Sequence, residues 1–427
     1  MIDESASDER PPRGRETAAD PRSNDPDHAP RITRRAVLRA LGAGAVVSAV
    51  TGSSTADESS EYWTVVALPD TQFYSERDDW TSYASDQTQW IVENLDAENI
   101  RFVTHEGDLV ENGSEETEWE RIDDVMSTLD GAVAYSALPG NHDWAVEGDR
   151  TSSSENFRTY FGPDRYANRD WFGGAGPDEE PLNFYQYFSG GGYEFLHLAL
   201  ELEPPGEVDD PSTPLGWAQR VLDRHRYRPT VLTTHSYLNE QGRTTDLHEY
   251  NGIGNTGEEM WEKLVRPNPQ VFMVLNGHHH DGDGENHQSS TNDAGLPVYE
   301  VLADYQDYDN GGNGWLRLVR FRPGGGDGSD DRIEFVTYSP SLDDYDDDDT
   351  SAFSFDVRFA DRFDPASWVG DVDGDGDIDQ DDLTRLQEHL AGRDVSVDAE
   401  AADVNDDGRV DVADAVTLDD YLDGTGG

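Results

Sequence analysis

The sequence predicts an α/β domain over residues 61–360 and a separate, small, all-α unit over residues 365–427. In the first region, short β-rich runs alternate with segments of helical spacing, which is typical of α/β folds. Its aromatic residues indicate a packed core, since the chain has 10 Trp, 18 Tyr and 15 Phe. The second region repeats one Asp-rich pattern, and each copy leads into an apolar-spaced helix.

The predicted strands are runs rich in β-branched and aromatic residues. They cover residues 62–68, 100–104, 132–137, 193–200, 230–234, 271–275, 298–302, 315–321 and 332–338. The last two look like a hairpin across a Gly-rich turn, so we expect the sheet to become antiparallel late in the domain. Helical spacing of apolar residues predicts helices over residues 80–95, 119–129, 215–226 and 257–265. A region of this length can bury a sizeable core.

The N-terminal residues are predicted not to belong to either domain. Residues 1–30 are polar and rich in Pro, Asp and Arg, and we predict that they are disordered. Residues 31–56 place Arg34 and Arg35 before a short stretch of small and apolar residues, which resembles a twin-arginine export signal. That stretch is shorter than the ~20 residues of a membrane span. We therefore expect a secreted or cell-surface protein with no membrane span in its mature chain.

Charge and composition exclude several classes of function. The 427 residues include 91 Asp+Glu against 31 Lys+Arg, which gives a net charge of -60, and Lys263 is the one lysine. Such a charge disfavours nucleic-acid binding through a general charged face. The lack of cysteine excludes disulfides, thiolate metal sites and a cysteine nucleophile. We interpret the acidic, lysine-poor composition as adaptation to molar salt, where charge repulsion is screened.

Polar clusters follow five of the predicted strands. Ligands of open α/β sheets bind beyond the carboxyl ends of the strands, so we expect these clusters to meet at one edge. Their N and O donors suit Mn²⁺, Fe, Zn²⁺ or Mg²⁺. The clusters are Asp70-Thr71-Gln72, Gly107-Asp108, Gly140-Asn141-His142-Asp143, His235 and Gly277-His278-His279-His280.

In this order, the clusters resemble the motifs of the calcineurin-like metallophosphoesterase superfamily: Asp-x-His, Gly-Asp, Gly-Asn-His-Asp/Glu, a lone His, and Gly-His-x-His. The resemblance implies a layered β-sandwich flanked by helices, and two divalent metal ions that ready water for attack on a phosphate mono- or diester. It implies that Asp70, Gln72 and His280 bind the first ion. It implies that Asn141, His235 and His278 bind the second, and that Asp108 bridges both.

The resemblance further implies that His142 contacts the phosphoryl group and protonates the leaving oxygen. We expect Glu111 to orient His142. The superfamily usually has His where this chain has Gln72, and an amide oxygen is a harder and weaker ligand for zinc. The first site is therefore expected to prefer Mn²⁺, Mg²⁺ or Ca²⁺, or to be partly empty. Purple acid phosphatases have Tyr at the position of Glu111, so no iron(III)–tyrosinate colour is expected.

Two other functions remain open at this point. A catalytically weak or inactive binding or scaffold protein would follow if Gln72 disables the site. A metal-dependent nuclease or nucleotide hydrolase of the same fold is the other. Arg158, Arg165 and Arg169, in the Gly/Asp-rich insert 144–190, are candidates for anion contact, or they merely offset local acids.

The second region contains two 12-residue loops that match a calcium-binding pattern of oxygen ligands. They resemble a type I dockerin module, which implies folding on Ca²⁺ and docking to a cohesin-like receptor. The acidic loop 341–350 is either a calcium site, a substrate groove or a solvated loop. The candidate calcium ligands are Asp371, Asp373, Asp375, Asp377 and Asp382, and then Asp403, Asn405, Asp407, Arg409 and Asp414.

Overall fold

The structure is a computed structural model, and it describes most of the chain beyond residue 61. The predicted disordered region and export signal lie outside the described residues, as do Asp375, Asp377 and Asp407 of the calcium loops. The described residues are 62–177, 180–226, 228–248, 251–325, 331–363, 369–373, 378, 380–393, 395–405 and 408–422.

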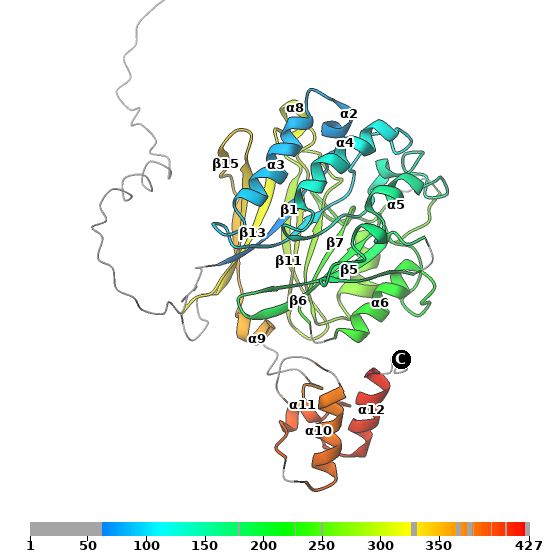
Figure 1. The fold of residues 1–427 in the computed structure, drawn as a ribbon, viewed down its shortest axis with the longest axis vertical. Helices are drawn as coiled ribbons and strands as arrows, with labels where there is room; N and C mark the ends of the chain where they lie inside the picture. Colours follow the sequence, from blue (N-terminus) through cyan, green and yellow to red (C-terminus); the bar gives the residue numbers. More distant parts are fainter. Residues whose placement is uncertain are drawn as a thin grey trace, which may run out of the picture. The chain divides into compact units, whose positions relative to one another are not determined.

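Two seven-stranded sheets form the centre of the large domain (Figure 1). The first sheet contains β1 (Trp63–Leu68), β2 (Ile100–His105), β3 (Ala134–Ser136), β13 (Leu316–Arg322), β14 (Arg332–Ser339), β15 (Asp344–Asp346) and β16 (Ala352–Asp356). The second contains β4 (Phe172–Gly176), β5 (Asn183–Gly190), β6 (Tyr193–Leu200), β7 (Thr230–Thr234), β10 (Val271–Asn276), β11 (Glu285–Thr291) and β12 (Pro297–Ala303). A small ribbon pairs β8 (Leu238–Asn239) with β9 (Gly242–Arg243).

Each sheet has a parallel centre and antiparallel margins. In the first sheet β1, β2 and β3 are parallel, while β13 and β14 continue antiparallel from β1. In the second sheet β6, β7, β10 and β12 are parallel, and β5 and β11 add antiparallel strands at either side. The predicted late antiparallel hairpin is confirmed as β13 and β14.

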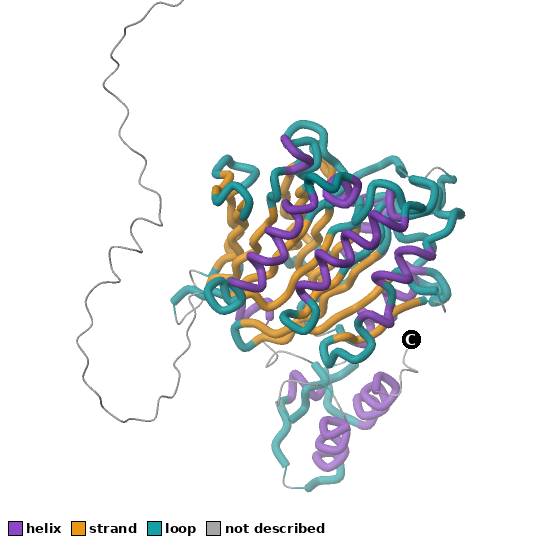
Figure 2. The backbone as a smooth tube through the Cα atoms, turned by 45° about the horizontal axis from the view of Figure 1, so that its top comes forward, coloured by secondary structure: helices purple, strands orange, loops and turns teal. Residues whose placement is uncertain are grey.

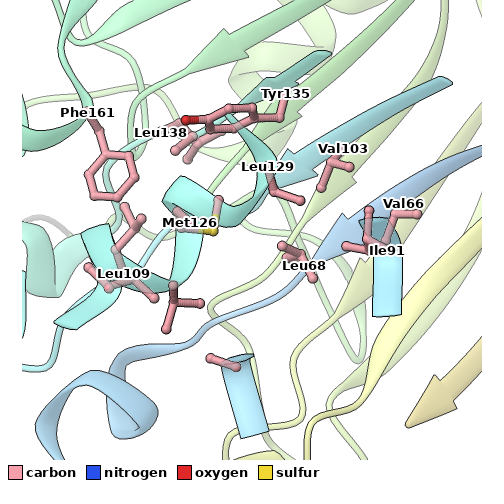
Figure 3. Close-up of a cluster of buried hydrophobic side chains, with 14 of the residues drawn as sticks. Val66, Leu68, Ile91, Val103, Leu109, Met126, Leu129, Tyr135, Leu138 and Phe161 are labelled. Atoms are coloured by element: carbon pink, nitrogen blue, oxygen red, sulfur yellow. The ribbon is translucent and has the colours of Figure 1, made fainter. Parts of the chain in front are cut away.

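The alternation of side chains in β1 explains why the sheet is covered on both faces. Trp63, Val65 and Ala67 pack in the core between the two sheets, against side chains such as Phe195. Val66 and Leu68 point the other way, into a core formed with the helices. Figure 3 shows Val66 and Leu68 in this second cluster beside Ile91 of a covering helix. Burial on both faces requires a continuously apolar strand, which is what the sequence supplies.

Helices cover the outer face of each sheet (Figure 2). Ala84 and Ile91, on one face of α3, pack on the first sheet. Helix α6 packs Leu215 and Leu222 on the second sheet, and it begins where the Thr213 hydroxyl accepts the Gly216 amide 3.2 Å away. The helices are α2 (Gln72–Glu76), α3 (Thr81–Glu93), α4 (Glu116–Met126), η1 (Ser127–Leu129), η2 (Asn141–Asp143), α5 (Glu155–Phe161), η3 (Pro163–Arg165), α6 (Pro214–Arg224), α7 (Gly257–Met260), η4 (Trp261–Val265), α8 (Asp309–Gly312) and α9 (Phe359–Phe363).

The predicted fold class is confirmed as a mixed α/β arrangement with layered sheets and flanking helices. The predicted strands and helices match observed elements to within a few residues. The insert 144–190, interpreted as irregular, instead contains α5, β4 and β5. Strands β11 and β16 were also not predicted, because β11 is a run of polar residues and the positions of β16 alternate between exposed and partly buried.

The C-terminal unit has a small core of its own. It contains α10 (Gln380–Leu390), α11 (Ala399–Ala402) and α12 (Val412–Leu422). Leu383 and Leu386 of α10 and Leu418 of α12 are buried together, and the partly buried Ile378 and Val410 pack against them. The two loop-helix units were predicted from the sequence, whereas α11 was not. Within the described residues, no helix combines the length and the hydropathy that crossing a membrane requires.

Candidate metal centre

The predicted polar clusters follow parallel strands, whose carboxyl ends lie at the same edge of each sheet. Asp70 follows β1, Asp108 follows β2, and Asn141 follows β3 in the first sheet. His235 follows β7 and His278 follows β10 in the second sheet. The two sheets therefore deliver these side chains to one edge of the sandwich.

Three of the side chains form the centre of a compact cluster. One ligand atom each from Asp108, His235 and His278 lies within 4.8 Å of the other two. His235 Nε2 is 3.3 Å from Asp108 Oδ2 and 3.1 Å from His278 Nδ1. His235 Nδ1 lies 2.9 Å from the Glu106 carbonyl oxygen. Donation from Nδ1 to this carbonyl leaves Nε2 with a free lone pair that faces the cluster, as in metal-binding histidines.

Asn141 and His142 join the cluster from η2. Asn141 Oδ1 lies 3.0 Å from His235 Nε2, so that an amide oxygen and an imidazole nitrogen point at the same place. The His142 backbone amide donates to Asp108 Oδ1 at 2.9 Å, which ties the two motifs together. The His142 ring Nδ1 lies 2.8 Å from the Glu111 carbonyl oxygen and 3.4 Å from Glu111 Oε2. Glu111 is thus placed to orient His142.

Asp70 and Gln72 adjoin the same cluster, with Asp70 Oδ1 3.8 Å from His235 Nδ1. Asp70 is buried and accepts the His278 backbone amide at 3.2 and 3.3 Å. Gln72 is buried at the start of α2, with Nε2 3.4 Å from Asp108 Oδ2 and a hydrogen bond from Nε2 to Gln306 Oε1. Gln72 Oε1 is buried without a hydrogen-bond partner among the described residues. An acceptor in that position fits a bound cation.

The glycines of the motifs are explained by close approach. A Cβ on Gly277 would lie 2.0 Å from Asp70 Oδ2, and one on Gly140 would lie 2.2 Å from Asp108 Oδ1. Only glycine allows the backbone to pass so close to these carboxylates. The glycine before His278 is therefore needed by Asp70, which is far away in the sequence.

His280 is placed differently from the other predicted ligands. Its side chain is 39% exposed, and Nδ1 lies 2.9 Å from Asp307 Oδ2. This contact leaves Nε2 as the ring nitrogen available to a metal, with Asp307 as the group that orients the ring. His279, between the two predicted ligands, lies 3.1 Å from the Ser236 hydroxyl through Nε2.

Buried negative charge is the dominant electrostatic feature of the site. Burial, together with the charges of Asp304 and Asp108, raises the pKa of Asp70 well above its usual range. Burial raises the pKa of Glu106 to about 8 and that of Asp304 to about 7. Burial of Asp108 is outweighed by His235 and His142, which lower its pKa. Several carboxylates buried so close together need cations to remain ionised.

These observations fit a pair of divalent cations. The donors are carboxylate and amide oxygens with imidazole nitrogens, they converge from both sheets, and Gln72 Oε1 has no protein partner. Asn141, His235 and His278 offer two imidazoles and an amide oxygen, while Asp70 and Gln72 offer oxygens. The two predicted donor sets therefore suit chemically different ions.

Sequence reasoning missed several residues of the site. Asp304 follows β12, the neighbour of β10, and is 1% exposed. The His248 ring lies 4.3 Å from the His278 ring, centre to centre, although its surrounding sequence gave no signal. His105, interpreted as structural, is buried and lies 2.9 Å from the Thr71 hydroxyl through Nε2. Only the position of Asp304 directly after a strand was a usable signal.

Two of the three candidate anion-binding arginines, Arg158 and Arg165, pair with local acids. Arg165 forms ion pairs with Asp123 and Asp130, and Arg158 forms one with Glu180. The acidic segment 341–350 contains the short strand β15, in which Asp344 and Tyr345 are exposed. Asp348 groups with Asp283 and Glu285, but the buried Glu285 already pairs with Arg317.

The two calcium loops share one local geometry. In the first loop the backbone amide of Asp373 donates to Asp382 Oδ1 at 3.0 Å, and in the second that of Asn405 donates to Asp414 Oδ1 at 3.2 Å. Carboxylates of Asp371, Asp373 and Asp382 lie within 4.8 Å of one another. Asp403 Oδ2 accepts the Gly408 amide at 2.8 Å, and Arg409 contributes position 7 of its loop.

Comparison with known families decides what this constellation is. The family model of the calcineurin-like phosphoesterases matches residues 64–282, which include every predicted metal ligand of the centre. The chain belongs to the calcineurin-like phosphoesterase family. A second family model, the dockerin type I domain, matches residues 369–423. The chain is therefore a phosphoesterase domain followed by a dockerin domain.

The uncharacterized protein YvnB of Bacillus subtilis (strain 168) is a curated relative of the phosphoesterase. It is 32% identical over 296 residues, which are 68% of this chain and 21% of that protein. The chain thus spans about a fifth of the length of the curated relative that it matches.

Three solved structures are partly similar to this chain. A purple acid phosphatase from yellow lupin (Lupinus luteus) seeds is 14% identical, with a TM-score of 0.41 over 70% of this chain and 55% of that one. The 5'-nucleotidase of Candida albicans SC5314 is 10% identical, with a TM-score of 0.34 over 61% and 52%. GAP50, the anchor in the inner membrane complex of Plasmodium, is 10% identical, with a TM-score of 0.36 over 70% and 89%.

Proposed function

We propose that the chain is an exported metal-dependent phosphoesterase that hydrolyses phosphate mono- or diesters with water at a binuclear metal site. The observation that carries this proposal is the convergence of Asp108, His235 and His278 within 4.8 Å, with Asn141 and Gln72 beside them. Asp70, Gln72, Asp108 and His280 would hold one ion, and Asp108, Asn141, His235 and His278 the other. Mn²⁺, Fe, Zn²⁺ and Mg²⁺ are the candidate ions.

The residues of the chain have separate tasks in this reaction. A bound pair of divalent cations supplies activation of water and neutralisation of charge on the phosphoryl oxygens. Asp108 would bind both ions, because the His142 amide fixes its Oδ1 and its Oδ2 lies near both His235 and Gln72. The His142 ring has Nδ1 held at the Glu111 carbonyl, so Nε2, which lies 3.7 Å from Glu147 Oε1, is the nitrogen that would protonate a leaving oxygen.

A substrate panel tests this function. The full chain, incubated with Mn²⁺ in molar KCl, is offered p-nitrophenyl phosphate and bis-p-nitrophenyl phosphate. We expect turnover of at least one, and loss of turnover in Asp108→Asn. The matched control is Asp331→Asn, a buried carboxylate that accepts the Gly324 and Phe359 amides near the start of β14.

Asp331 lies at the opposite edge of the sheet from the metal centre. Ile333 of β14 pairs with Phe321, which pairs with Trp63 at the beginning of β1. Asp331→Asn should therefore keep turnover. Turnover by Asp108→Asn at the wild-type rate would refute the assigned centre. A wild-type chain that binds Mn²⁺ but hydrolyses neither ester would favour the alternative function, a binding or scaffold protein.

We also infer that the dockerin domain docks the enzyme to a cohesin-like receptor in the presence of Ca²⁺. Its helix α12 exposes Val412 and Val416, one turn apart, with exposed fractions of 67% and 53%. Two exposed apolar side chains on one helix face suit a protein interface. A twin-arginine route would deliver the enzyme to the cell surface or beyond, where such receptors act. The net charge of -60 disfavours the alternative of a nuclease, because the phosphates of nucleic acid carry the same sign of charge.

A further inference from the structure

The segment that follows β12 reaches the metal centre, although it belongs to none of the recognised motifs. Met273 to Asn276 of β10 pair in parallel with Tyr299 to Leu302 of β12. Asp304, directly after β12, therefore lies at the same edge of the sheet as His278, which follows β10. The Asp304 side chain is 1% exposed, so its carboxylate is held away from solvent.

Only one of the two oxygens of the Asp304 carboxylate has a hydrogen-bond partner among the described residues. Oδ1 accepts the Gln306 backbone amide at 2.9 Å. Oδ2 is buried and has no hydrogen-bond partner among the residues that the structure describes. A buried carboxylate oxygen without a donor is costly, so it requires a proton or a cation. Apart from burial itself, the negative charge of Asp304 raises the pKa of Asp70 more than any other neighbouring charge does. The two carboxylates therefore share one environment.

Gln306 contacts the Gln72 amide, whose Oε1 is a second buried oxygen without a hydrogen-bond partner among the described residues. Gln306 Oε1 accepts a hydrogen bond from Gln72 Nε2. This hydrogen bond uses the nitrogen of the Gln72 amide and fixes which way the amide faces. Gln72 Oε1, which is buried and has no partner in the described part of the chain, is the atom left for a cation.

We propose that residues 304–306 complete the site of the first ion, with Asp304 as an additional carboxylate ligand and Gln306 as a positioning residue for the Gln72 amide. The proposal rests on the proposed function, because it assumes an ion beside Asp70. It compensates chemically for the missing imidazole at position 72. With Asp70, Gln72, Asp108 and Asp304, the first site offers mainly hard oxygen donors, which favour Mn²⁺ or Mg²⁺ over Zn²⁺.

Metal binding by the full chain tests this proposal without relying on turnover. The metal-free wild type and Asp304→Asn are titrated with Mn²⁺ by calorimetry, and Asp331→Asn serves as the matched loss of a buried carboxylate. The calcium loops are identical in all three, so their contribution cancels. We expect two Mn²⁺ in the centre of the wild type and of Asp331→Asn. We expect Asp304→Asn to bind one of them about 10–100-fold more weakly.

A second variant keeps the proposal testable if Asp304→Asn does not fold. Gln306→Ala removes a half-buried side chain and should weaken the same Mn²⁺ by about 10-fold while Zn²⁺ binding changes less. Mn²⁺ binding that is unchanged in Asp304→Asn overturns the ligand assignment, and unchanged binding in Gln306→Ala overturns the positioning role. A wild type that binds no Mn²⁺ in the centre instead refutes the proposed function itself.

Discussion

Gly277→Ala tests the close approach that builds the metal centre. The new Cβ would lie 2.0 Å from Asp70 Oδ2, whereas ordinary contact begins at 3.4 Å, so the carboxylate must retreat by about 1.4 Å. The backbone of Gly277 does not have a positive φ, so alanine adds no conformational strain of its own. Because a misplacement of about 1 Å costs on the order of 100-fold in rate, we expect at least this loss in kcat/KM.

The assay for Gly277→Ala combines the Mn²⁺ content of the purified chain with phosphoester hydrolysis. Gly295→Ala is the control, since a Cβ there meets nothing within 4 Å and the residue lies in the turn between β11 and β12. Its φ of 78° makes alanine costly by about 1–2 kcal/mol in stability. We expect this control to melt earlier and keep its activity. Wild-type metal content and kcat/KM in Gly277→Ala would refute the reasoning.

Three further predictions concern catalysis, the dockerin domain and salt. His142→Ala should lower kcat by about 100- to 10,000-fold while two Mn²⁺ still bind, because the ring acts on protons and not as a ligand; loss of metal would contradict this role. The dockerin domain of the full chain should resist proteolysis in millimolar Ca²⁺ and be degraded in chelator. Asp382→Ala should be degraded in both conditions, and equal resistance of the wild type in chelator would show that calcium is not needed. The melting temperature should rise from dilute buffer to molar KCl, because the screening length falls from ~30 Å at 0.01 M to ~3 Å at 1 M while the net charge is -60; an unchanged melting temperature would argue against adaptation to salt.

The strands that could be predicted from the sequence are those that are buried at most or all of their positions. Strands such as β1 and β10 are buried on both faces, so their apolar runs are continuous and easily recognised. Strand β16 has a burial pattern that alternates between exposed and intermediate, and β4 is mostly glycine, so neither has a clear apolar signal. Their pairing is decided by tertiary contacts with β14 and β5.

The candidate site was predictable wherever a short motif preserved the spacing between a strand end and its donor. Asp108 and His278 have such motifs, with glycines that the close approach explains. Asp304 has no neighbouring glycine or histidine, and its relevance depends on β12 lying beside β10, which sequence spacing does not reveal. The contact of Gln72 with Gln306 joins residues 234 positions apart and is likewise decided by the fold alone.

Anomalous diffraction from crystals of the Mn²⁺-loaded chain tests the central claim most directly. The account predicts two manganese peaks about 3.5–4 Å apart with Asp108 between them. His235 and Asn141 should lie beside one peak, and Asp70 and Gln72 beside the other. A chain without manganese at Asp108, or with a single ion on the side of His235, would contradict the binuclear account.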